Sequence, residues 1–134
     1  MKLTLETAEI FVPDGAPADV ALARTTHMAF GAHQDDLEIM AFPGILACFH
    51  RPDRWFAGVV VTNGAGSPRD DVYKHYTDEE MRAVRGKEQR KAAVVGEYGA
   101  QVLLDYPSAA LRDATNPAPV DDMVALLRAA RPNV

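Results

Sequence analysis

One imidazole and three carboxylates occur within six consecutive positions of this chain, in His33-Gln34-Asp35-Asp36-Leu37-Glu38. Aspartate is a common helix N-cap, and acidic side chains near a helix N-terminus are stabilising by about 0.3–1 kcal/mol each. Capping therefore accounts for one or two of the aspartates. It does not account for His33 or for Glu38. We favour the alternative, which is metal or acid–base chemistry at a site.

The spacing of these residues suits a catalytic zinc site. His33 and Asp36 are three positions apart, so a tight turn lets both side chains face one ion. A catalytic zinc site uses nitrogen, sulfur or oxygen ligands and keeps one position open for water. Asp35, between the two ligands, is left free to take a proton from that water. This supplies two of the usual three protein ligands, and the third must come from elsewhere.

Composition excludes several functional classes. The chain has 134 residues, of which 48% are hydrophobic, enough for one globular domain. Its net charge of -5 argues against nucleic-acid binding, which favours a basic surface. There is no apolar run of about 18 residues for a membrane span and no signal-peptide pattern, which predicts a soluble cytoplasmic protein. The single cysteine, Cys48, excludes an internal disulfide and a multi-cysteine zinc site.

Strand and helix patterns alternate along the chain. The run Val59-Val60-Val61 is typical of a strand buried on both faces of a parallel sheet. Thr77 and Glu80 form a capping-box pattern at the start of a long helix. The expected elements are a short strand or hairpin at 10–12, strands at 26–30, 55–62 and 101–105, and helices at 36–50, 77–96 and 120–131.

Hydrophobic spacing also predicts which face of each helix is buried. In the first helix, which Pro43 either kinks or starts, the apolar positions include Ile39, Met40 and Leu46. The predicted inner faces of the two later helices contain Met81, Val84, Ala92 and Val95, and Val120, Met123, Val124 and Leu127.

This order of elements argues for right-handed βαβ crossovers. We expect an α/β fold with a Rossmann-like parallel sheet flanked by helices. The closing helix would ordinarily lead into another strand. Residues 26–134 are therefore expected to be the N-terminal part of a larger domain, truncated after its third central βα unit, and residues 1–25 an N-terminal extension.

Two further segments lie where ligands could bind. Asn63-Gly64-Ala65-Gly66-Ser67-Pro68 follows the second central strand, at the carboxyl edge where parallel α/β sheets bind ligands. It lacks the dinucleotide fingerprint and the Walker spacing, so phosphate binding has little support. Arg85 and Glu88 are three positions apart on the long helix, and are either an ordinary surface pair or part of a site.

The segment Ala32-His33-Gln34-Asp35-Asp36-Leu37-Glu38 resembles a family signature, Ala-His-Pro-Asp-Asp-x-Glu. That signature belongs to the PIG-L/LmbE family of zinc-dependent N-deacetylases, which remove acetyl groups from N-acetylglucosamine-type sugars and their conjugates. Thr62-Asn63-Gly64 and the Arg85-x-x-Glu88 pair also agree, and the resemblance extends from about Thr26 to Val134. Gln34 replaces the usual proline.

The resemblance implies a role for each site residue. His33 and Asp36 would bind zinc or another divalent metal, Asp35 would be the general base, and Arg85 and Asn63 would bind the amino-sugar substrate. The family's later histidine motif, which supplies the third zinc ligand, would lie beyond Val134. We therefore expect little deacetylase activity from these 134 residues. His75 is the other histidine that could reach the site.

Two other functions remain open. A receiver-like signalling module would use Asp105, at a strand end, as a phosphoacceptor with magnesium. It gives His33 no role, and no late strand ending in lysine is present. A noncatalytic sugar-binding remnant would keep the fold and bind sugar without zinc. The sequence leaves the substrate and the oligomeric state open, a homo-oligomer included.

Overall fold

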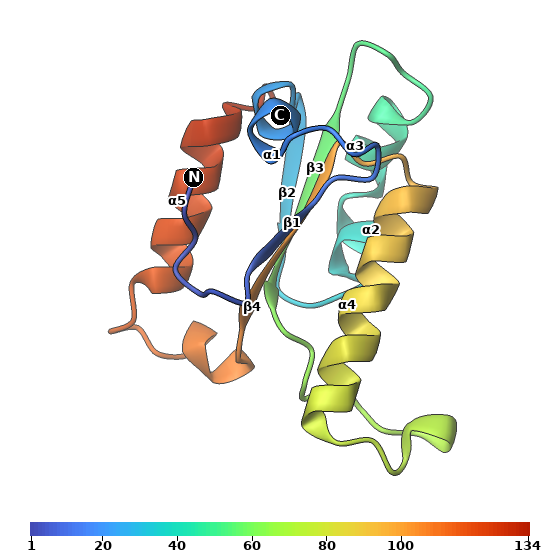
Figure 1. Cartoon of the computed structure of the whole chain (residues 1–134), viewed down its shortest axis with the longest axis vertical. Helices are drawn as coiled ribbons and strands as arrows, with labels where there is room; N and C mark the ends of the chain where they lie inside the picture. Colours follow the sequence, from blue (N-terminus) through green and yellow to red (C-terminus); the bar gives the residue numbers. More distant parts are fainter.

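A four-stranded sheet between two layers of helices forms the molecule, as a computed structural model describing residues 1–134 shows (Figure 1). The strand order is β1-β4-β3-β2. Strands β2 (His27–Gly31), β3 (Phe56–Thr62) and β4 (Ala100–Tyr106) are parallel, and β1 (Glu9–Phe11) pairs antiparallel with β4. The predicted α/β fold with parallel central strands is confirmed. The edge strand β1 makes the sheet mixed.

Helices cover both faces of the sheet (Figure 1). Helices α1 (Ala18–Ala23) and α5 (Ala118–Ala130) lie on one face. Helices α2 (Asp36–Met40), α3 (Phe42–Cys48) and α4 (Asp78–Val95) lie on the other. Two 3-10 turns, η1 (Asp71–Tyr73) and η2 (Ser108–Leu111), occur in the loops after β3 and β4. None of the helices has the length and apolar character needed to cross a bilayer.

Strand β3 is the centre of the core, and all seven of its residues are buried. Its alternate side chains point to opposite faces, as the period of a strand requires. Val59 and Val61 pack with Leu126 of α5, whereas Val60 packs with Leu37 of α2. The prediction of a strand buried on both faces is confirmed.

The helix expected over 36–50 is two short helices, separated at Ala41. Pro43 lies in the first turn of α3, where its missing N–H costs no hydrogen bond. Because the chain restarts its helical turn there, a single buried face does not form. Ile39, Met40 and Leu46 are 75%, 66% and 59% exposed, so their predicted burial was wrong.

The buried faces of α4 and α5 also differ from the apolar pattern. Gln89 is buried in α4 and Asp122 in α5, whereas Val95 and Val120 are exposed. Polar side chains with internal partners take positions that a hydrophobicity count assigns to solvent. At the start of α4 the capping box is confirmed, because Thr77 and Glu80 each bond to the other's backbone N–H.

Asp122 connects three parts of the chain through hydrogen bonds. Its carboxylate accepts hydrogen bonds from the backbone N–H of Thr4 (3.1 Å), the hydroxyl of Thr4 (3.0 Å) and the hydroxyl of Tyr106 (2.7 Å). Burial and the hydrogen bond to Asp122 raise the pKa of Tyr106 to about 12. The N-terminal segment, β4 and α5 therefore share one buried polar contact.

This contact predicts a loss of stability in alkali. The folded protein holds the Tyr106 proton up to a pKa of about 12, above the ordinary value of 10.0. The stabilisation of the folded state by the protonated Tyr106 hydroxyl is therefore complete below pH 10 and is lost as the pH rises through 12. Between pH 9 and 12, the free energy of unfolding in urea should fall by roughly 1–2 kcal/mol more in the unsubstituted protein than in the Tyr106→Phe variant. Equal losses in the two proteins would contradict this assignment.

Candidate active site

The loops that follow β2, β3 and β4 lie at one end of the sheet (Figure 1). Backbone hydrogen bonds hold them together beyond the strands. The N–H of Thr62 donates to the carbonyl of Ala32 (2.9 Å), and the N–H of Asn63 donates to the carbonyl of Tyr106 (2.9 Å). The carboxyl edge of the parallel strands therefore brings the acidic segment and the glycine-containing loop to one place.

The turn after β2 places His33 beside Asp36. Asp36 Oδ2 accepts a hydrogen bond from the backbone N–H of His33 (2.8 Å) and lies 3.8 Å from His33 Nδ1. Asp35 makes the turn possible by adopting a positive φ of 81°, which is uncommon for a residue with a side chain. The imidazole is 58% exposed and the Asp36 side chain 31% exposed, so both can reach a ligand.

Arg85 of α4 holds Asp35 at this turn. Its guanidinium donates to Asp35 Oδ2 (2.7 Å), to Glu88 Oε2 (2.6 Å) and to the carbonyl of Gln34 (3.1 Å). Burial acts to lower the pKa of Arg85, but the two carboxylates outweigh it and raise that pKa. The predicted pair of Arg85 and Glu88 forms, and Arg85 also joins the acidic turn.

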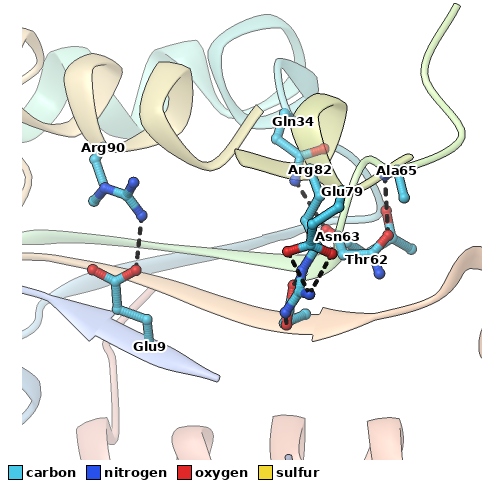
Figure 2. Close-up of polar contacts among 9 residues, drawn as sticks. Glu9, Gln34, Thr62, Asn63, Ala65, Glu79, Arg82 and Arg90 are labelled. Carbon is cyan, nitrogen blue, oxygen red and sulfur yellow. Dashed lines mark hydrogen bonds and ion pairs between the residues drawn. The ribbon is translucent and has the colours of Figure 1, made fainter. Parts of the chain in front are cut away.

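Gln34 connects the turn to the end of β3. Its Nε2 donates to the carbonyl of Thr62 (3.0 Å), as Figure 2 shows. Gly64 packs against the other atom of the same amide, with a φ of +71°. A Cβ atom at Gly64 would lie 2.5 Å from Gln34 Oε1 and 2.9 Å from Arg85 Cβ. Only glycine fits this position without a shift of its neighbours.

Asn63 shapes the loop from within. Its Oδ1 accepts a hydrogen bond from the N–H of Ala65 (3.1 Å), an Asx turn visible in Figure 2. Its side chain does not line the cleft described next. Substrate binding by Asn63 therefore stays a prediction.

A cleft of about 470 Å³ opens at this end of the sheet, and no hydrophobic residue lines it. His33 and Arg85 line it directly, and Asp35 and Asp36 contact these two residues. Ser67 and Pro68 line it from the loop after β3, which the sequence placed at the ligand-binding edge. Ser108 and Arg112 also line it and were not predicted, because only the fold brings the segment after β4 to this place.

A buried polar network supports the turn from behind. Gln89 of α4 accepts from the N–H of Asp35 (3.4 Å) and donates to Glu38 (2.9 Å) and Gln101 (3.2 Å). The hydroxyl of Tyr98 also donates to Glu38 (2.7 Å), and burial with this carboxylate raises the pKa of Tyr98. Sequence reasoning found Glu38 but not its partners. Gln89 lies one helical turn after Arg85, which is the signal that could have identified it.

Replacing Gln89 with leucine should destabilise the protein. The change removes the amide donor from Glu38, which keeps only the Tyr98 hydroxyl, and leaves Gln101 Oε1 and the N–H of Asp35 without their partner. Each group left unsatisfied costs about 1–3 kcal/mol. Urea unfolding should show a loss of roughly 2–4 kcal/mol. Lys91→Leu, at an exposed position of the same helix, is the control and should change stability by less than about 0.5 kcal/mol. Equal effects of the two changes would mean that the network contributes nothing.

The other candidate residues are placed away from this turn or are already paired. His50 binds Glu97 (3.0 Å) after α3, and His75 is exposed in the loop before α4. Asp105 is 11% exposed and forms an ion pair with Arg82, which also contacts Glu79 (Figure 2). That pair occupies the carboxylate that a phosphoacceptor needs free. No three His, Cys, Asp or Glu side chains converge to hold one ion.

The comparisons with known proteins match most of the chain to one family. The sequence model of the PIG-L family, described as GlcNAc-PI de-N-acetylase, matches residues 28–134. The match begins at β2 and includes the turn, the loop after β3 and all of α4 and α5. No curated protein and no solved structure matches the chain significantly.

Proposed function

We propose that this chain, which belongs to the PIG-L family, carries the zinc-binding and proton-transfer residues of an N-deacetylase acting on an N-acetylglucosamine-type sugar or conjugate. The observation that carries the proposal is the turn at His33, Asp35 and Asp36. It sets two metal donors side by side, an imidazole and a carboxylate, and holds a second carboxylate against Arg85, beside a polar cleft. The ion pair that occupies Asp105 gives the receiver-like alternative no comparable support.

The two donors fit a zinc ion in kind and in spacing. Nitrogen and oxygen ligands bind zinc at about 2.0–2.2 Å, so two of them on a tetrahedral ion lie about 3.3–3.5 Å apart. His33 Nδ1 and Asp36 Oδ2 are 3.8 Å apart, on an exposed and a partly exposed side chain, and a small rotation would bring the two atoms into range. Bound zinc would polarise the amide carbonyl and lower the pKa of water. A third ligand has to come from outside this pair.

Asp35 is suited to move the proton. Arg85 binds its Oδ2, and no hydrogen bond within the chain occupies Oδ1, which is left for water. In the reaction, water attacks the acetamide carbonyl, and Asp35 accepts its proton. The carbon–nitrogen bond then breaks, Asp35 returns the proton to the leaving amine, and acetate is released. Arg85 keeps the carboxylate oriented through both transfers.

Zinc binding tests the ligand assignment. Isothermal titration of the chelator-treated chain with zinc should show weak binding, because one turn supplies only two ligands. His33→Ala should lower that affinity by more than the roughly 10–100-fold that loss of a supporting hydrogen bond costs. His50→Ala, which removes a histidine paired with Glu97, should leave the affinity unchanged. Equal affinities of the two variants would contradict the assignment.

Acetate release tests the activity. The chain should release acetate slowly from N-acetylglucosamine conjugates when zinc is present and not after chelation. A second candidate is a sugar-binding protein without catalysis, for which the polar cleft beside the turn is the supporting observation. Sugar binding that is independent of zinc, with no acetate released at saturating zinc, would establish that candidate instead.

A further inference from the structure

We infer that Arg69 is a positioning residue for the sugar, because its guanidinium holds the β3–α4 loop (residues 63–77) in the shape that forms one wall of the cleft. The inference rests on the proposed function and adds a residue that governs the affinity for substrate. Arg69 does not line the cleft itself. It acts through Gly66, Ser67 and Pro68, which do.

Little else holds this loop in place. It projects away from the sheet (Figure 1), and none of residues 66–76 is buried. Its own backbone hydrogen bonds join residues only three apart, as from Ser67 to Gly64 (3.0 Å). All side-chain hydrogen bonds and the ion pair of residues 66–76 belong to Arg69. A segment with so few buried contacts opens easily unless such bonds restrain it.

Arg69 makes four contacts with one guanidinium. Its Nε donates to the carbonyl of Tyr76 (2.9 Å), and its terminal nitrogens donate to the carbonyls of Ser67 (3.3 Å) and Ala65 (2.9 Å). It also forms an ion pair with Asp78, the first residue of α4. A guanidinium has five N–H donors in a fixed plane, so one side chain can serve all four acceptors. The start of the loop, its end and the first turn of α4 therefore meet at Arg69.

The carbonyls that Arg69 binds lie next to the cleft wall in the chain. The bonds to Ala65 and Ser67 fix the backbone on both sides of Gly66, where a Cβ atom would meet nothing within 4 Å. With these bonds the wall is formed before the sugar binds. Without them, only the fraction of molecules with a formed wall is competent, and the apparent affinity falls by that fraction. Proton transfer should be unaffected, because Asp35 lies in the turn after β2.

Arg69→Met tests the inference on the full chain, because it keeps the length of the side chain and removes every donor. Hydrogen exchange followed by mass spectrometry should be about 10-fold faster or more in peptides of the β3–α4 loop, and unchanged in β3 and β4. Titration calorimetry should show about 10-fold weaker binding of methyl N-acetylglucosaminide. The affinity for zinc should not change. In acetate release, KM should rise by a similar factor and kcat should stay within about twofold.

Arg51→Met is the matched control, because Arg51 pairs with Asp53 and precedes β3, at the opposite end of the sheet from the cleft. It should change neither loop exchange nor sugar affinity. Arg69→Lys keeps a charge beside Asp78 but loses the planar set of donors, so it should recover less than about threefold of the lost affinity. Equal sugar affinity of the unsubstituted protein and Arg69→Met, an equal loss in Arg51→Met, or full recovery with lysine would overturn the inference.

The outcomes separate this inference from the proposed function. If sugar binding depends on Arg69 but no acetate is released at saturating zinc, the positioning role stands and the deacetylase does not. If the unsubstituted protein and Arg69→Met release acetate with the same KM, the deacetylase stands and the positioning role does not. If the unsubstituted protein binds no sugar, both fall.

Discussion

Asp35→Asn is expected to lower the rate of zinc-dependent acetate release by about 10²–10⁴-fold, the range that a general base contributes. An amide keeps the size of the carboxylate but cannot accept the proton of water. The affinity for zinc should not fall, because Asp35 is not one of the two donors that face each other in the turn. The measurement is the rate of acetate release at saturating zinc, with titration calorimetry of the same samples.

The control for this change is Asp121→Asn, at an exposed position in the first turn of α5. It should leave both rate and zinc affinity unchanged. If Asp35→Asn loses zinc instead of rate, Asp35 is a ligand, and the roles of Asp35 and Asp36 must be exchanged. If the variant keeps the full rate, no proton passes through Asp35 and the mechanism is wrong.

Gly64→Ala is expected to destabilise the fold by about 2–4 kcal/mol and to reduce activity further in the molecules that remain folded. A positive φ costs a residue with a Cβ about 1–2 kcal/mol. The added atom would also lie 2.5 Å from Gln34 Oε1, a contact that real structures do not show. Relief requires a shift of Gln34 or of Arg85, and both support the turn that carries Asp35.

Gly66→Ala provides a matched control in the same loop. A Cβ atom there meets nothing within 4 Å, and the residue has no positive φ. Its effect on urea unfolding should be below about 0.5 kcal/mol. Equal destabilisation by the two alanines would show that the loop after β3 is sensitive to any substitution, and that the contact with Gln34 is not the cause.

Local patterns predicted the elements that depend on neighbouring residues. The buried valine run of β3 and the capping box of α4 were identified because their periods and spacings are set within a few positions. The pairing of His33 with Asp36 was identified for the same reason, since both lie in one turn.

Contacts between distant segments were not predictable in the same way. Gln89 and Asp122 are polar, so a pattern of hydrophobic positions assigns them to solvent, although their partners bury them. Arg112 joins the cleft only because parallel strands end at a common edge. Ile39 and Leu46 lie on two short helices that are separated at Ala41, so the apolar spacing counted across both helices did not define one buried face.

Two residues of helix α4 bind Asp35. Arg85 donates to the Asp35 carboxylate, and Gln89 accepts a hydrogen bond from the Asp35 backbone N–H. These two residues lie one helical turn apart, on a helix of 18 residues. The carboxylate is therefore anchored to a long, capped helix, although it stands in an exposed turn. Its motion should follow that of the helix: conditions that speed amide hydrogen exchange along α4 should loosen Asp35 to the same degree, before the sheet itself opens.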